Sequence, residues 1–195
     1  MKLLCSQIIV AVAVLTVSQA ATAHEKTYIF NIDGATELPA NASPGTGFAK
    51  VTFDLDLVTM RVEASFQDLL GTTTAAHIHC CDFQPNGAAG VSTQTPSFTG
   101  FPLGVTSGSM DNTFDMTLTS SYRAAFLTAN GGSVSNALNS LLAGLDSGQA
   151  YFNIHTSLFQ PGEIRGLAVL IPEPTSALLA LISLGLPVMW RRSSR

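Results

Sequence analysis

The chain has 195 residues, of which 46% are apolar and 11% are charged, a balance that is unusual for a wholly soluble protein. The 9 basic and 13 acidic residues leave a net charge of −4, and three of the basic residues fall in the last five positions. This distribution argues against a nucleic-acid-binding surface and predicts that part of the chain meets a membrane. The 3 cysteines are too few for a disulfide-built fold, whereas the 11 phenylalanines can form a core.

The N-terminus has the three regions of a secretory signal peptide. Lys2 precedes an apolar stretch over 3–17, and an Ala-Thr-Ala sequence at 21–23 supplies the small residues that signal peptidase requires. The apolar stretch is shorter than the ~20 residues that a membrane-spanning helix needs, which favours a cleaved peptide over a retained anchor. We therefore expect export, with cleavage between Ala23 and His24.

The C-terminus consists of three successive segments. Pro172-Glu173-Pro174 is followed by an apolar segment over 177–190, and the chain ends in a cluster that contains Arg191 and Arg192. Composition alone allows a short transmembrane helix whose arginines stay in the cytoplasm. The order of the segments also resembles a PEP-CTERM sorting signal, which an exosortase recognises and cuts near the triplet. The resemblance implies an exported protein of the cell envelope, surface or extracellular space, with a transient inner-membrane anchor and with extracellular polysaccharide or other surface proteins as partners.

Between the two signals, residues 24–171 form the predicted exported domain. β-branched and aromatic residues alternate with polar ones there, and turn residues separate these stretches. The expected strands cover 26–32, 49–57, 60–66, 75–80, 113–118, 149–155 and 163–171. The short join at 57–59 predicts an antiparallel hairpin. About seven short strands favour an antiparallel, Greek-key-like β-sandwich.

One amphipathic helix interrupts the strand pattern, over residues 133–146. Its apolar residues recur at the helical spacing, with Leu141 at the centre of the stripe. Ser133 is the expected N-cap, and Gly148 lies beyond the expected end. We expect the stripe to pack against the sheets. By contrast, the segment 85–108 is rich in Gly, Pro, Ser and Thr and predicts a long loop with at most a short edge strand.

Three histidines are the candidates for chemistry. His77 and His79 lie two apart on one expected strand, so their side chains leave the same face about 6.6 Å apart. His155 should also face outward, because Phe152 and Ile154 take the inner face of its strand. If the two strands are neighbours, His77, His79 and His155 could together bind copper or zinc. The alternative is that each imidazole hydrogen-bonds to a separate neighbour.

The residues beside the histidines allow two interpretations. A hairpin loop over 156–162 would place Glu163 opposite His155, and Asn153 opposite Arg165. The Glu163 carboxylate could then orient His155 as a metal ligand. The other interpretation is an ordinary cross-strand ion pair beside a turn.

Cys80 and Cys81 are the two cysteines of the expected mature chain, since Cys5 would leave with the signal peptide. Outside the cytoplasm two thiols tend to oxidise. Adjacent Cα atoms lie about 3.8 Å apart, below the usual disulfide range of ~4.4–6.8 Å, so a vicinal bridge requires the strand to break there. The alternatives are Cys81 as a metal ligand beside His77 and His79, or two free thiols.

Catalytic motifs are absent: the sequence has no nucleophile elbow, phosphate-binding loop, dinucleotide fingerprint or C-x-x-C. The H-x-H pair His77 and His79 resembles the metal-binding strand of copper/zinc superoxide dismutase. That resemblance implies a superoxide-dismutase-like oxidoreductase as the alternative to a non-enzymatic protein. The rest of that ligand set has no counterpart, because His24 is the one other histidine.

Two stretches carry a resemblance to a known family. They are A-H-I-H at 76–79, and Y-F-N-I-H-T at 151–156 followed by P-G-E-I-R-G at 161–166. In this order they resemble the CHRD domain, a module named after the repeats of chordin, over roughly residues 26–170. Cys80 and Cys81 stand where many members have glycine and a small residue. The resemblance implies a β-sandwich of unassigned biochemical activity, and we expect a non-enzymatic surface or matrix protein.

Overall fold

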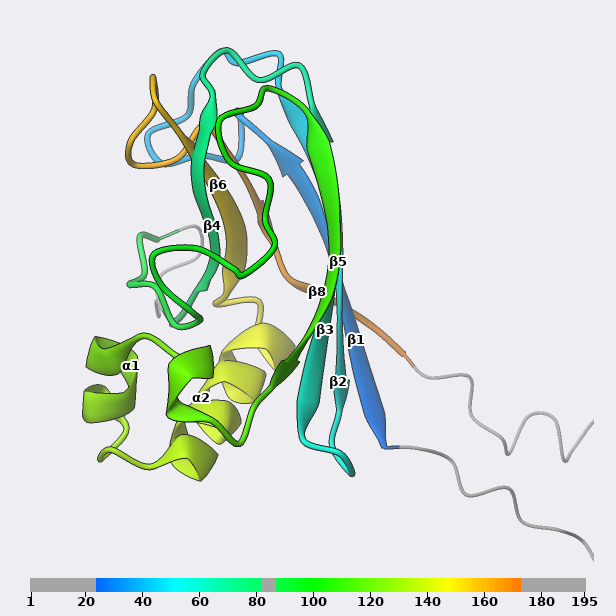
Figure 1. The fold of residues 1–195 in the computed structure, drawn as a ribbon, viewed down its shortest axis with the longest axis vertical. Helices are drawn as coiled ribbons and strands as arrows, with labels where there is room; N and C mark the ends of the chain where they lie inside the picture. Colours follow the sequence, from blue (N-terminus) through cyan, green and yellow to red (C-terminus); the bar gives the residue numbers. More distant parts are fainter. Residues whose placement is uncertain (1–23, 82–86, 173–195) are drawn as a thin grey trace, which may run out of the picture.

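The computed structural model describes residues 24–81 and 87–172, which consist mainly of antiparallel strands with a few short helices (Figure 1). The predicted signal peptide, the apolar C-terminal helix and all of the sorting tail except Pro172 lie outside these residues. Within the described part of the chain, no helix is long and apolar enough to span a bilayer.

The eight strands belong to one sheet. They are β1 (Glu25–Asp33), β2 (Thr46–Asp54), β3 (Thr59–Gln67), β4 (Thr73–His79), β5 (Gly108–Asp115), β6 (Tyr151–Thr156), β7 (Ile164–Leu167) and β8 (Val169–Ile171). Their order across the sheet is β4-β6-β7-β1-β2-β3-β5, and β8 also pairs with β1. The helical elements are η1 (Thr119–Ser121), α1 (Ala124–Ala129) and α2 (Val134–Asp146).

The sheet curls like half of a barrel, so that β4 and β6 face β3 and β5 across the core (Figure 1). Phe98, from the β4–β5 connection, joins the two layers, since its ring lies 5.8 Å from Phe152 in β6 and 5.3 Å from Phe114 in β5. The predicted antiparallel, mostly β fold is confirmed. The predicted sandwich takes the form of two opposed layers of one continuous sheet, because β7 pairs with both β6 and β1.

The hairpin of β2 and β3 forms as the alternation predicts. Val51 pairs with Val62 and Phe53 with Met60, and all four side chains are at most 1% exposed. Their polar neighbours on the same strands point to the other face of the sheet. The strands end at the turn over 55–58, so β2 is shorter than the predicted run to residue 57.

The predicted helix is α2. Ser133 is its N-cap, and the hydroxyl of this residue accepts a hydrogen bond from the Asn136 amide. Ala137, Leu141 and Leu145 are at most 1% exposed and belong to the hydrophobic core. The helix α1 was not predicted, because its six residues include no buried side chain and no capping side chain.

Leu141 provides a direct test of this packing. We expect Leu141→Ala to lower the free energy of unfolding by about 2–5 kcal/mol, because the side chain is 0% exposed and its removal leaves a cavity. Urea unfolding measures the change, and Asn139→Ala, on the exposed side of α2, should stay within about ±0.5 kcal/mol. A Leu141→Ala loss inside that surface range would contradict the packing.

The connection between β4 and β5 returns along β4 before it crosses to the other layer. The amide of Ser92 donates to the Ile78 carbonyl, and that of Phe98 donates to the Ala76 carbonyl. An isolated antiparallel β-bridge also links His79 to Val91. The segment 87–98 thus runs beside the strand that carries two of the candidate histidines.

Candidate metal site

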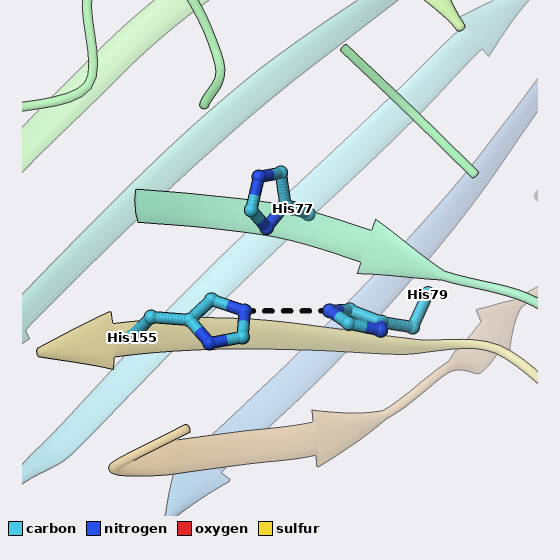
Figure 2. A group of neighbouring side chains, drawn as sticks. All are labelled: His77, His79 and His155. Carbon is cyan, nitrogen blue, oxygen red and sulfur yellow. Dashed lines mark hydrogen bonds between the residues drawn. The ribbon is translucent and has the colours of Figure 1, made fainter. Parts of the chain in front are cut away.

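The three candidate histidines come together on two neighbouring strands. β4 and β6 are antiparallel, with Ala75 opposite His155 and His77 opposite Asn153. One nitrogen from each of His77, His79 and His155 lies within 4.8 Å of the others. Figure 2 shows the three rings grouped over β4 and β6, with the His79 and His155 rings pointing at each other. The ring centroids are separated by 5.2–5.9 Å, which makes the cluster nearly equilateral.

The side chains face away from the core, but they are not exposed in the way that the sequence indicated. His77 is 6% and His79 is 8% exposed, because the segment 87–98 lies against them, and the β6–β7 turn lies against His155. Strand alternation correctly separates these residues from Ile78 and Ile154. It could not show that a loop would cover the outer face.

Each imidazole is oriented by a backbone carbonyl. His77 Nε2 lies 2.6 Å from the Pro96 oxygen, and His79 Nδ1 lies 2.9 Å from the Ala89 oxygen. His155 Nδ1 lies 2.8 Å from the Gln160 oxygen. Because a carbonyl can only accept, each of these nitrogens carries the hydrogen and donates it.

The remaining ring nitrogens are therefore free of hydrogen when the rings are neutral. Burial lowers the pKa of His77 and of His79 to about 4, and it also lowers the pKa of His155. The unprotonated atoms are then His77 Nδ1, His79 Nε2 and His155 Nε2. Among the described residues His77 Nδ1 has no hydrogen-bond partner, and the other two atoms are 3.4 Å apart. Two lone pairs at this separation repel each other unless a cation lies between them.

The metal-free protein should lose stability as the pH falls. A histidine whose pKa is lower in the folded state stabilises the fold above its unfolded pKa of 6.5, and this contribution is lost as the pH falls toward about 4. We expect a loss of roughly 2–3 kcal/mol for each of the two buried histidines. Urea unfolding between pH 7 and pH 4 with a chelator present measures it. His77→Gln should remove part of the loss, and an unchanged slope would contradict this account.

A stack of side chains that sequence reasoning missed holds the His79 ring. The ring of Tyr151 lies parallel to it, with centroids 4.8 Å apart at 11°. The Arg165 guanidinium lies 4.7 Å from the centre of the Tyr151 ring. Arg165 is 2% exposed and donates to the carbonyls of Thr36 and Gly87. The alternation of side chains along β6 and β7 could have predicted this stack, because it places Tyr151 and Arg165 on the same face of the sheet as the three histidines.

The register of the last hairpin is as predicted, since Asn153 pairs with Arg165 and Ile154 with Ile164. The expected contact between the Glu163 carboxylate and His155 is not formed. Glu163 precedes the first residue of β7, and its carboxylate accepts hydrogen bonds from the backbone amides of Leu70 and Gly71. The carboxylate that seemed available to orient a metal ligand is therefore used to connect separate segments of the fold.

The two cysteines form a vicinal disulfide directly after the end of β4. Both sulfurs approach α2, with Cys81 Sγ 3.5 Å from the Ser140 carbonyl oxygen. The structure therefore places Cys81 outside the histidine cluster. His24, the other candidate at the N-terminal side, is exposed and contacts Asp56 at 3.3 Å, also away from the cluster.

The fold and the site together define a small antiparallel β domain with a loop-covered group of three histidines. Residues 28–167 match the CHRD domain, and the chain belongs to this family. Membership of this family suggests an extracellular or secreted domain protein. No curated protein and no solved structure matches the chain.

Proposed function

We propose that this chain is an exported CHRD-domain protein that binds a copper or zinc ion through His77, His79 and His155. The observation that carries the proposal is the convergence of His77, His79 and His155, which bring one ring nitrogen each to within 4.8 Å of the others. Two nitrogens bound at about 2.0–2.1 Å to one tetrahedral or trigonal ion lie roughly 3.3–3.6 Å apart. The 3.4 Å between His79 Nε2 and His155 Nε2 fits this separation.

The hydrogen bonds around the site also fit metal binding. In metalloproteins the second nitrogen of a ligating histidine usually donates to a carbonyl or a carboxylate, which fixes the tautomer and the direction of the ring. All three histidines have such a partner here. Burial keeps the rings neutral, as ligation requires.

Titration of the metal-free full chain with copper or zinc tests the proposal. We expect one ion per chain, with His79→Ala and His155→Ala each lowering the affinity by more than about 100-fold, the upper end of what loss of an outer-shell partner costs. His24→Ala removes an exposed imidazole outside the cluster and should leave the affinity unchanged. His155 is less buried than His79, so its variant guards against a folding defect. Equal affinity in all four proteins would reject the site.

The proposed role is binding rather than catalysis, at the cell surface or in the extracellular matrix. The two terminal signals support export by signal peptidase and an exosortase, and the family supports an extracellular location. The acidic exported domain would meet extracellular polysaccharide or other surface proteins. Intact-mass measurement of native material should give a chain that begins near His24 and ends near Pro174, whereas a full-length mass would contradict the export route.

A further inference from the structure

The electrostatic surroundings of the three histidines favour an ion of low charge. The ligands are neutral, and their N–H groups donate to backbone carbonyls, not to carboxylates. Apart from the imidazoles themselves, the ionic side chain that acts on His77 and His79 among the described residues is Arg123, which is positive. A second cation, Arg165, lies beyond Tyr151.

The buried carboxylates of the region do not change this balance. Glu163 is turned toward the backbone amides of Leu70 and Gly71. Glu37 lies beside Arg165, with 3.9 Å between its Oε2 and the arginine Nε, so the guanidinium offsets its charge. No described carboxylate belongs to the group of candidate ligands.

An ion bound here would keep its full charge in a covered site. The free-energy cost of transferring an ion from water into a low-dielectric interior rises with the square of its charge. The cost for a dication is therefore about four times that for a monocation. Nearby positive groups oppose a dication more strongly as well. Zn²⁺ would also need a fourth ligand, because protein sites with three histidines complete its tetrahedron with water. Cu⁺ is satisfied by three ligands, and the three rings bring one nitrogen each to within 4.8 Å of the others.

We infer that the cluster of His77, His79 and His155 selects Cu⁺ over Cu²⁺ and Zn²⁺. This inference rests on the proposed metal-binding function and adds the identity and oxidation state of the bound metal. The site thus acts as a carrier or store for the reduced ion, held by neutral imidazoles under the 87–98 segment.

Competition with chromogenic chelators under anaerobic conditions tests the inference, with Cu⁺, Cu²⁺ and Zn²⁺ each added to the metal-free full chain. We expect Cu⁺ to bind at least about 100-fold more tightly than Cu²⁺, which raises the potential of the bound copper by about 118 mV over the free pair. Voltammetry reads that shift independently. Cys80→Ser with Cys81→Ser removes both cysteines of the described residues and should leave the Cu⁺ affinity unchanged.

The outcomes separate the two proposals. Binding of Zn²⁺ or Cu²⁺ as tight as that of Cu⁺, and lost in His79→Ala, would overturn the selectivity and retain the metal site. Absence of any His79-dependent binding would overturn both. Cu⁺ binding that disappears in the double cysteine variant, and not in His79→Ala, would assign the copper to the cysteine pair and overturn the inference.

Discussion

Replacing Glu163 by glutamine should lower the free energy of unfolding by about 3–5 kcal/mol. The carboxylate is 0% exposed and accepts hydrogen bonds from the amides of Leu70 at 2.6 Å and Gly71 at 3.0 Å. It also accepts from the hydroxyls of Ser43 at 2.6 Å and Thr156 at 2.7 Å. Glutamine keeps the shape but presents two N–H donors to groups that can only donate or that already do so. Three separate segments of the chain therefore lose one of the two acceptor oxygens that connect them.

The same variant has a signature in its pH dependence. Burial opposes ionisation of Glu163, but the hydrogen bonds from Ser43, Leu70, Gly71 and Thr156 outweigh it and hold the pKa below its usual value. A carboxyl whose pKa is lower in the folded state stabilises the fold above its unfolded pKa, and this stability is lost as the pH falls. The difference between wild type and Glu163→Gln should therefore shrink in acid.

Urea unfolding at pH 7 and pH 4 provides both measurements. Glu25→Gln, at an exposed position, is the matched control and should change stability by no more than about 0.5 kcal/mol. A Glu163→Gln effect as small as that of the control at pH 7 would show that the carboxylate does not connect these segments.

Local periodicity accounts for the elements that the sequence predicted well. The β2–β3 hairpin and α2 have their own alternation or helical stripe, so each could be found within its own residues. β5 shows the limit of this reasoning, because it begins at Gly108 and not at Thr113. Its first residues have little strand pattern of their own, and they become a strand because they pair with β3.

Strand pairing was the part of the fold that periodicity could not supply. The predicted strand over 163–171 is divided at Ala168, whose amide donates to Ala150. Its two parts differ in their main partners, since β7 pairs chiefly with β6 and at one position with β1, whereas β8 pairs with β1. A period of two fixes which side chains share a face, but it does not select the neighbour. The single curled sheet follows from that choice.

For the candidate site, too, the sequence predicted one part and missed another. Alternation placed His77, His79 and His155 on the outer faces of their strands, which the structure brings side by side. The groups that orient the rings are main-chain carbonyls of Pro96, Ala89 and Gln160. Any residue supplies a carbonyl, so these partners leave no trace in the sequence. The orientation of Glu163 was missed because it stands before β7, where alternation does not yet apply.

Gly166 is the position where the family motif G-E-I-R-G should tolerate change least. Gly166 lies in β7 and pairs with Phe152 of β6. A Cβ added to Gly166 would clash with the backbone oxygen of Asn31 and would lie 2.8 Å from the Asn31 carbonyl carbon. Main chain cannot move aside as a side-chain tip can, so Gly166→Ala must separate β7 from β1, where Asp33 pairs with Arg165. We expect a loss of about 3 kcal/mol or more in the free energy of unfolding, at the upper end of overpacking effects.

Gly90→Ala is the control for this prediction, because a Cβ at Gly90 meets no atom within 4 Å and its φ is not in the left-handed region. Urea unfolding should show a change within about ±0.5 kcal/mol for Gly90→Ala and the large loss for Gly166→Ala alone. Similar stability of the two variants would mean that β1 and β7 can separate without cost. The expected result would show that Glu163 and Gly166 of this motif stabilise the fold. Among the residues that carry the family resemblance, His77, His79 and His155 then remain as the candidates for metal binding.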